Sequence, residues 1–174
     1  MTDAAHFTET YRQHGIPIYR FALHMSGSET VAEEVTQDVF LTLIRQPGGF
    51  DAKRGTMAAY LYGIARNLVL RHLEQERRFR PVDEDGEAEP FCCDGDLLED
   101  LTRSENIQAV QEAVLRLPEK YREAVVLCDL QEVSYEAASK VLGCAVGTVR
   151  SRLHRGRGLL ITRLQKKLQA RCAI

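Results

Sequence analysis

The chain has 174 residues, of which 44% are hydrophobic and 7% aromatic, and it contains no tryptophan. This composition is globular, and the low aromatic content fits small helical bundles. No apolar run approaches the roughly 20 residues that a bilayer-spanning helix needs, and the N-terminus lacks the basic start and apolar core of a signal peptide. The sequence therefore predicts a cytoplasmic protein without membrane insertion.

The net charge of −2 hides a sharp partition along the chain. Residues 81–105 hold ten acidic residues and one arginine, so this segment carries −9 and the remainder of the chain carries +7. Prolines and a lack of periodicity in the same stretch are typical of a linker. We therefore expect an N-terminal domain over 1–80, a flexible acidic linker over 81–104 and a C-terminal domain over 105–174.

Apolar residues recur at helical spacing in the N-terminal part. The pattern predicts helices over 7–25, 29–45 and 56–78, and the first of them can break at Pro17. The second helix presents acidic residues beside apolar ones, a mixed face that suits docking on another pair of helices. The alternative is an acidic face that is merely solvated.

The C-terminal part continues the helical pattern, with predicted helices over 106–117 and 119–130 followed by a helix-turn-helix. Ser134 is a good N-cap for the first helix of that motif, and Gly143 can take the positive φ at which this helix must stop. The last helix follows and can run to Leu168. No alternation of period two is long enough to predict a strand, so the expected fold class is all-α, with two small helical domains.

The last helix is expected to bind DNA. Val149 and Leu153 face inward, which leaves four polar side chains on the opposite face: Arg150, Ser151, His154 and Arg155. A helix-turn-helix places such a helix in the major groove, where arginine can contact guanine. A solvated basic face is the alternative, but residues 145–174 hold eight lysines or arginines and no acidic residue, which favours a polyanionic partner.

Cysteines and histidines show no spacing that indicates a metal or catalytic site. The five cysteines are an odd number and predict no disulfide framework, and the adjacent Cys92 and Cys93 lack the C-x₂-C spacing of a zinc site. We therefore expect no metal, no cofactor, no small-molecule substrate and no enzymatic activity. A redox- or metal-responsive switch, formed by Cys92 and Cys93 with Cys172, stays open as an alternative or as an addition to another function.

Eight short segments together resemble the extracytoplasmic-function (ECF) sigma factors, a group within the sigma-70 family of bacterial RNA polymerase subunits. These segments are 32–41, 50–51, 60–61, 64–67, 117–119, 122–123, 134–136 and 146–155. They occur in the family's order and flank a divergent segment where the family has its linker. The resemblance implies an alternative sigma factor that binds core RNA polymerase, directs promoter-specific initiation and is controlled by an anti-sigma factor.

The resemblance also implies roles for individual residues. It assigns core-polymerase binding, with the clamp helices of the largest subunit as the partner, to Glu34, Asp38, Val39 and Leu41. It assigns recognition of the minus-ten element to Tyr60, Arg66, Asn67 and Arg71, and recognition of the minus-thirty-five element to Arg150, Ser151, His154 and Arg155. Phosphates or acidic groups of a partner are expected at Arg152, Arg157 and Lys166 or Lys167. The family usually has tryptophan at the position of Tyr60, where tyrosine can still stack. It often has aspartate at the position of Arg71, and the charge that Arg71 adds beside the predicted pocket leaves the identity of the captured bases open.

A stand-alone helix-turn-helix regulator, which binds operators without polymerase and usually as a dimer, is the competing interpretation. Such a protein would bind specific duplex DNA on its own, and a mutation at Asp38 would not matter. In the sigma interpretation, the acidic linker crosses the active-site cleft, along the path of nascent RNA, where it can imitate nucleic acid in a basic channel. The free protein is then expected to be compact, with its basic surfaces hidden.

Overall fold

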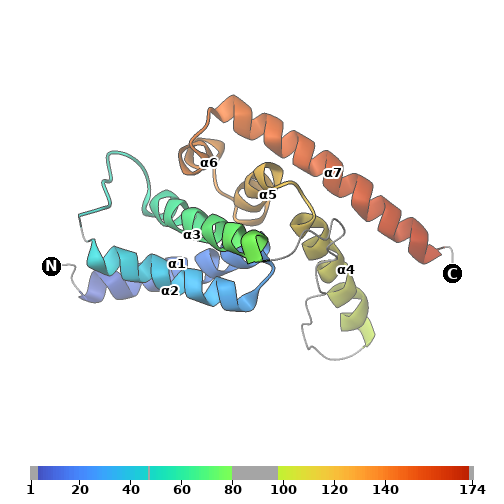
Figure 1. The fold of residues 1–174 in the computed structure, drawn as a ribbon, viewed down its shortest axis with the longest axis horizontal. Helices are drawn as coiled ribbons and strands as arrows, with labels where there is room; N and C mark the ends of the chain where they lie inside the picture. Colours follow the sequence, from blue (N-terminus) through green and yellow to red (C-terminus); the bar gives the residue numbers. More distant parts are fainter. Residues whose placement is uncertain (1–3, 47, 80–97, 173–174) are drawn as a thin grey trace.

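The computed structural model describes residues 4–46, 48–79 and 98–172 (Figure 1). All regular elements within these ranges are helical, which confirms the predicted all-α class. The elements are α1 (Ala4–Ser26), α2 (Glu29–Arg45), α3 (Met57–Phe79), α4 (Leu98–Leu115), α5 (Glu119–Val125), a π-helical turn η1 (Val126–Leu130), α6 (Tyr135–Leu142) and α7 (Val146–Cys172). No helix in the described ranges combines the length and the apolar character that crossing a membrane requires.

The N-terminal helices α1, α2 and α3 pack around a shared apolar core. Phe21, Val35 and Leu61 are completely buried there, one from each helix. α1 continues through Pro17, so the break considered at this residue is absent. A proline inside a helix costs about 3 kcal/mol. Burial of the α1 side chains that follow Pro17, such as Phe21 and Met25, offsets this cost.

The C-terminal helices form the predicted helix-turn-helix from α6 and α7. The Ser134 side chain accepts a hydrogen bond from the backbone N–H of Ala137 at 3.2 Å, and Gly143 ends α6 at φ 62°. These two residues fix the motif through local backbone chemistry. The helix predicted over 119–130 ends instead as the π turn η1. α7 reaches Cys172, four residues beyond its predicted end.

α4 begins at Leu98, inside the segment predicted to be the linker. Seven residues of the predicted 81–104 linker are therefore helical. Its remainder, 81–97, lies outside the described residues, as do most of the acidic side chains on which the charge argument rests.

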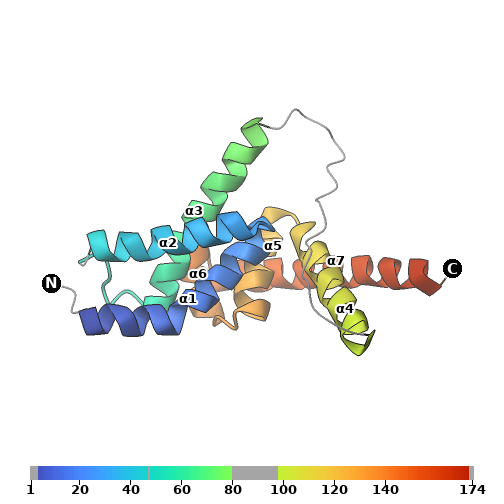
Figure 2. The same ribbon diagram turned by 90° about the horizontal axis from the view of Figure 1, so that it is seen from below.

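The two groups of helices share one continuous core. α3 contacts α6, and α1 contacts both α4 and η1. α7 is a long rod that crosses α5 and extends past α4, whereas the C-terminal half of α3 projects from the N-terminal bundle (Figures 1 and 2). The arrangement brings residues far apart in sequence into contact, and it places α6 against the start of α3.

Close packing of α7 on α5 depends on Gly156. A Cβ atom added at Gly156 would lie 2.7 Å from Cγ2 of Val125, whereas one added at Gly158 would meet nothing within 4 Å. We expect Gly156→Ala to lower the free energy of unfolding by about 1–2 kcal/mol because it overpacks this contact. Gly158→Ala should raise it by about 0.5–1 kcal/mol through helix propensity. Urea denaturation of both variants would check this, and equal effects at the two positions would contradict it.

Candidate nucleic-acid and protein interfaces

An apolar groove of about 1040 Å³ runs between α1 and α2. Its apolar lining comes from both helices: Phe7, Tyr11, Ile16, Tyr19, Phe40, Leu41 and Ile44. Tyr11 packs edge-on against Phe40, with the ring centroids 4.8 Å apart. Three of the lining residues remain largely exposed, at 52% for Tyr11, 64% for Ile16 and 51% for Ile44. This α1–α2 groove therefore presents apolar surface that the fold itself does not bury.

The residues assigned to polymerase binding lie in different environments around α2. Leu41 lines the α1–α2 groove, and Asp38 is exposed on the same helix. Glu34 is exposed, and its carboxylate lies 3.9 Å from Nε2 of His72 on α3. Val39 is fully buried in the core, so its assignment as a contact residue is wrong. Its side chain holds α2 against the neighbouring helices and is not available to a partner.

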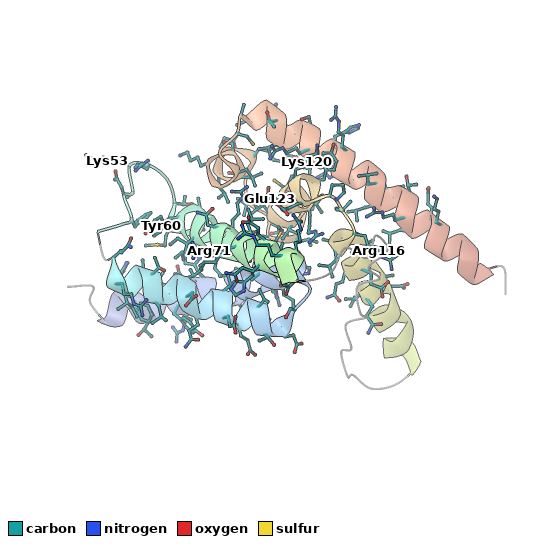
Figure 3. The ribbon with its side chains drawn as sticks, viewed as in Figure 1. Lys53, Tyr60, Arg71, Arg116, Lys120 and Glu123 are labelled. Atoms are coloured by element: carbon teal, nitrogen blue, oxygen red, sulfur yellow. The ribbon has the colours of Figure 1, made fainter. Side chains whose placement is uncertain are left out.

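The residues assigned to the minus-ten element separate into two pairs. Tyr60 and Asn67 line a cavity of about 430 Å³, which we call the α3–α6 cavity. Arg66 and Arg71 are not part of its lining. The cavity is bounded by α3, by the loop before it and by α6: Gly49, Phe50, Asp51, Arg54, Gly55, Thr56, Ala59, Tyr60, Gly63, Ile64, Asn67, Lys140 and Val141. Tyr60 lies near the loop that carries Lys53, and Arg71 lies further along α3 (Figure 3).

The Arg66 side chain is engaged by an acidic residue of the C-terminal helices. Its Nε donates to Oε1 of Glu123 at 2.6 Å, and Glu123 is only 3% exposed. Glu123 lies between α5 and α3 (Figure 3). A buried carboxylate needs such a partner, because taking an unpaired charge out of water is costly. Arg71, in contrast, is exposed on α3.

Further polar contacts join the N-terminal and C-terminal helices. Lys140 of α6 donates to the backbone carbonyl of Arg54 at 3.0 Å, which places an ammonium group beside the α3–α6 cavity. The Tyr62 hydroxyl donates to Oε1 of Gln131 at 3.3 Å. Burial raises the pKa of Tyr62 to about 12, so this phenol stays protonated as a donor.

Arg122 makes the most extensive of these contacts. Its guanidinium donates to the backbone carbonyls of Leu115, Leu117 and Met25, the last of them at 2.7 Å and from the end of α1. Burial lowers the pKa of Arg122 from its ordinary value. An arginine remains protonated despite such a shift, so Arg122 is a permanent cationic link between α1, α4 and α5.

The residues assigned to the minus-thirty-five element share one exposed face of α7. Arg150, Ser151, His154 and Arg155 are exposed, whereas Val149 and Leu153 are buried against the helix-turn-helix core. Arginine and histidine side chains on a helix that protrudes in this way are suited to a DNA groove.

The described cysteines give no support to a redox or metal site. Cys128 and Cys144 are half-buried free thiols. Burial raises the pKa of Cys128 to about 11, which keeps it in the unreactive thiol form. Within the described ranges, no group of histidine, cysteine and acidic residues could hold a metal ion. Cys92, Cys93 and the side chain of Cys172 lie outside the described residues.

Comparison with known families matches each of the two groups of helices to a known protein region. Residues 10–79 match Sigma-70 region 2, and residues 107–160 match Sigma-70, region 4. These matches define a chain that carries regions 2 and 4 of the sigma-70 class. The chain is 37% identical to ECF RNA polymerase sigma factor SigE of Mycolicibacterium smegmatis over 91% of its own length and 61% of that protein. It is 31% identical to ECF RNA polymerase sigma factor SigW of Bacillus subtilis, over 85% of this chain and 83% of that one. The chain therefore belongs to the ECF sigma factors.

Two solved structures share the fold. Sigma factor RpoE from Bartonella quintana, in complex with the anti-sigma factor NepR, is 24% identical with a TM-score of 0.76, over 95% of this chain and 98% of that one. CnrH, in complex with the cytosolic domain of CnrY, is 24% identical with a TM-score of 0.71, over 94% and 90%. At this level of identity the likeness concerns the fold.

Proposed function

We propose that this chain binds core RNA polymerase and directs it to promoters that carry a minus-ten and a minus-thirty-five element. The observation that carries the proposal is the presence of sigma-70 regions 2 and 4 in one chain, in that order. We retain the domain limits 1–80 and 105–174 as part of the proposal. A stand-alone regulator is disfavoured because it would have no use for the polymerase-binding region.

The α1–α2 groove is the proposed docking site for the clamp helices of the largest polymerase subunit. Its apolar centre can take side chains from a partner helix, and its exposed acidic neighbours Glu33 and Asp38 can set register and orientation. Aromatic and aliphatic anchors at the centre of an interface usually dominate its energetics. Tyr11 and Ile16 therefore join Asp38 and Leu41 in the proposed polymerase-binding set, and α1 becomes half of the site.

The α3–α6 cavity is proposed to become a pocket for an unstacked base. Capture of such a base needs an aromatic or apolar wall and a polar partner for the base edge, which Tyr60 and Asn67 provide. Arg71 is proposed to hold backbone phosphates, and Arg66 joins it once Arg66 is released from Glu123. Because Lys140 and Val141 of α6 also line the cavity, α6 must move away before a DNA strand occupies it.

Recognition of the minus-thirty-five element is proposed to depend on Arg150, Ser151, His154 and Arg155. We expect Arg150→Ala to reduce discrimination at one base pair by about 1–3 kcal/mol. Lys166→Ala, which changes an exposed cation further along α7, should weaken binding to all sequences alike because a phosphate contact carries no base information. Affinities of the holoenzyme for promoters with single substitutions would check this. Unchanged discrimination in Arg150→Ala would contradict the assignment.

The experiment that tests the whole proposal is run-off transcription from a promoter library with bacterial core polymerase, with and without the chain. Selective initiation that appears only with the chain, and is lost in Asn67→Ala, would support it. Specific duplex binding without initiation would favour the stand-alone regulator.

An anti-sigma factor is the proposed regulator. RpoE, which shares this fold, was solved with the anti-sigma factor NepR. A protein that stabilises the packed arrangement of the two groups of helices would keep Arg66 paired with Glu123 and α6 over the cavity. Such a partner would therefore silence the chain without touching the base-reading residues.

A further inference from the structure

A chain of side-chain contacts runs from the π turn η1 to the DNA-reading face of α7. Arg157 donates through Nε and Nη2 to the two carboxylate oxygens of Asp129, at 3.0 and 2.6 Å. Arg157 also lies close enough to the Tyr135 side chain to interact with it electrostatically. The guanidinium of Arg150 lies over the face of the same tyrosine ring, with Cζ 5.7 Å from the ring centroid. One tyrosine therefore contacts two arginines of α7.

Local structure explains why Tyr135 occupies this place. Tyr135 is the first residue of α6, directly after the N-cap Ser134. Arg150 and Arg157 are seven residues apart on α7, which is about two helical turns, so both side chains project from nearly the same side. Asp129 reaches Arg157 from η1. The π turn, the start of α6 and the recognition helix thus meet at one aromatic ring.

The contacts leave Arg150 exposed but restrict its direction. A free arginine side chain samples many rotamers and must lose that freedom when it makes a bidentate contact to a base. A guanidinium within about 6 Å of an aromatic centroid is attracted to the ring face. The Arg157–Asp129 pair lies beside the same tyrosine, which hinders the ring from turning away.

We propose that Tyr135 is a positioning residue for promoter specificity, whose ring holds Arg150 in the direction from which it reads a base edge of the minus-thirty-five element. The proposal rests on the function proposed above for Arg150. It adds a determinant outside the recognition helix, because Tyr135 itself belongs to the preceding helix and needs no contact with DNA. Asp129 and Arg157 support it indirectly by fixing the ring.

The test is a set of variants in the full chain, assembled with core polymerase and measured on promoters with each single base substitution in the minus-thirty-five element. Tyr135→Leu should reduce discrimination at the base pair read by Arg150 by about threefold to fivefold, the range expected for an exposed cation–π contact. Tyr135→Phe should keep the wild-type discrimination at this base pair, because the ring face remains. In an Arg150→Ala background, Tyr135→Leu should have no further effect on discrimination.

Stepwise fluorination of phenylalanine at position 135 removes electron density from the ring and nearly preserves its shape. Discrimination should fall with each added fluorine, while the thermal unfolding temperature stays constant. This series also covers the case in which Tyr135→Leu does not fold. Uniform weakening on every promoter, or discrimination insensitive to fluorination, would overturn the proposal and leave Tyr135 with a structural role. Failure of the proposed function looks different, because Arg150→Ala alone would then leave discrimination unchanged.

Discussion

Ile16→Asp and Ile44→Asp should each weaken binding of the chain to the clamp helices of core polymerase by at least about thirtyfold. The two side chains line opposite walls of the α1–α2 groove, one on α1 and one on α2, and are 64% and 51% exposed. Truncation of a hot-spot side chain lowers the binding free energy by about 2 kcal/mol or more. A carboxylate in its place adds the cost of burying a charge. Transcription by the reconstituted holoenzyme should fall with the affinity.

The chain offers a matched control for this experiment. Ile107 on α4 and Ile161 on α7 are 52% and 56% exposed and do not line the groove. Ile107→Asp and Ile161→Asp make the same chemical change at similar exposure, and we expect both to bind the isolated clamp helices as the wild type does. A general effect of surface charge would lower the affinity of all four variants. Wild-type affinity in Ile16→Asp and Ile44→Asp would show that the clamp helices bind elsewhere.

Features set by local backbone chemistry could be predicted from the sequence. Ser134 caps α6 and Gly143 ends it, and the alternation of buried and exposed positions on α7 follows from helical periodicity. Such signals depend on a few neighbouring residues, so they survive into the folded protein unless tertiary packing opposes them. Pro17 is the case in which packing prevails, because the burial of Phe21 and Met25 keeps α1 continuous.

Helical periodicity by itself predicts that Val39 is buried. The spacing of four that places Val31 and Val35 in the core applies equally to Val39, and all three are buried. A partner-binding residue must instead come from the neighbouring positions on the helix, where Asp38 is exposed and Leu41 lines the groove. Helical periodicity is therefore a stronger guide to exposure than membership of a motif.

The contribution of α1 to the groove and the contacts between the two groups of helices could not be predicted. Arg66 and Glu123 are 57 positions apart, and Lys140 contacts a carbonyl 86 positions away. Neither pair has a sequence signal, since any arginine could pair with many carboxylates. The overlap between residues proposed to bind DNA and residues that join the helices becomes visible only in three dimensions.

Glu123→Gln should shift the free chain toward an arrangement in which the N-terminal and C-terminal helices are separated. The substitution keeps the size of the side chain but replaces the charge-assisted hydrogen bond to Arg66 with a neutral one. The loss of about 1–1.5 kcal/mol corresponds to a roughly tenfold change in the equilibrium. Small-angle scattering should show a larger radius of gyration, and affinity for a single-stranded minus-ten oligonucleotide should rise as the cavity beside Asn67 opens.

Glu74→Gln is the matched control, because Glu74 pairs with Arg78 within α3 at 2.6 Å and both side chains are exposed. An exposed pair within one helix contributes little and joins no separate elements, so both measurements should stay at their wild-type values. If the radius of gyration and the oligonucleotide affinity of Glu123→Gln also keep their wild-type values, the buried pair does not hold the two groups of helices together.

A double variant separates the charge pair from simple packing. Arg66→Met combined with Glu123→Leu replaces the ion pair by apolar side chains, which is often neutral or stabilising at a buried site. We expect this variant to remain packed in scattering, yet to bind the minus-ten strand less tightly than Glu123→Gln because it lacks Arg66. The packed arrangement and promoter binding then compete for one side chain. In the function proposed here, an activating signal would therefore have to release Arg66 from Glu123.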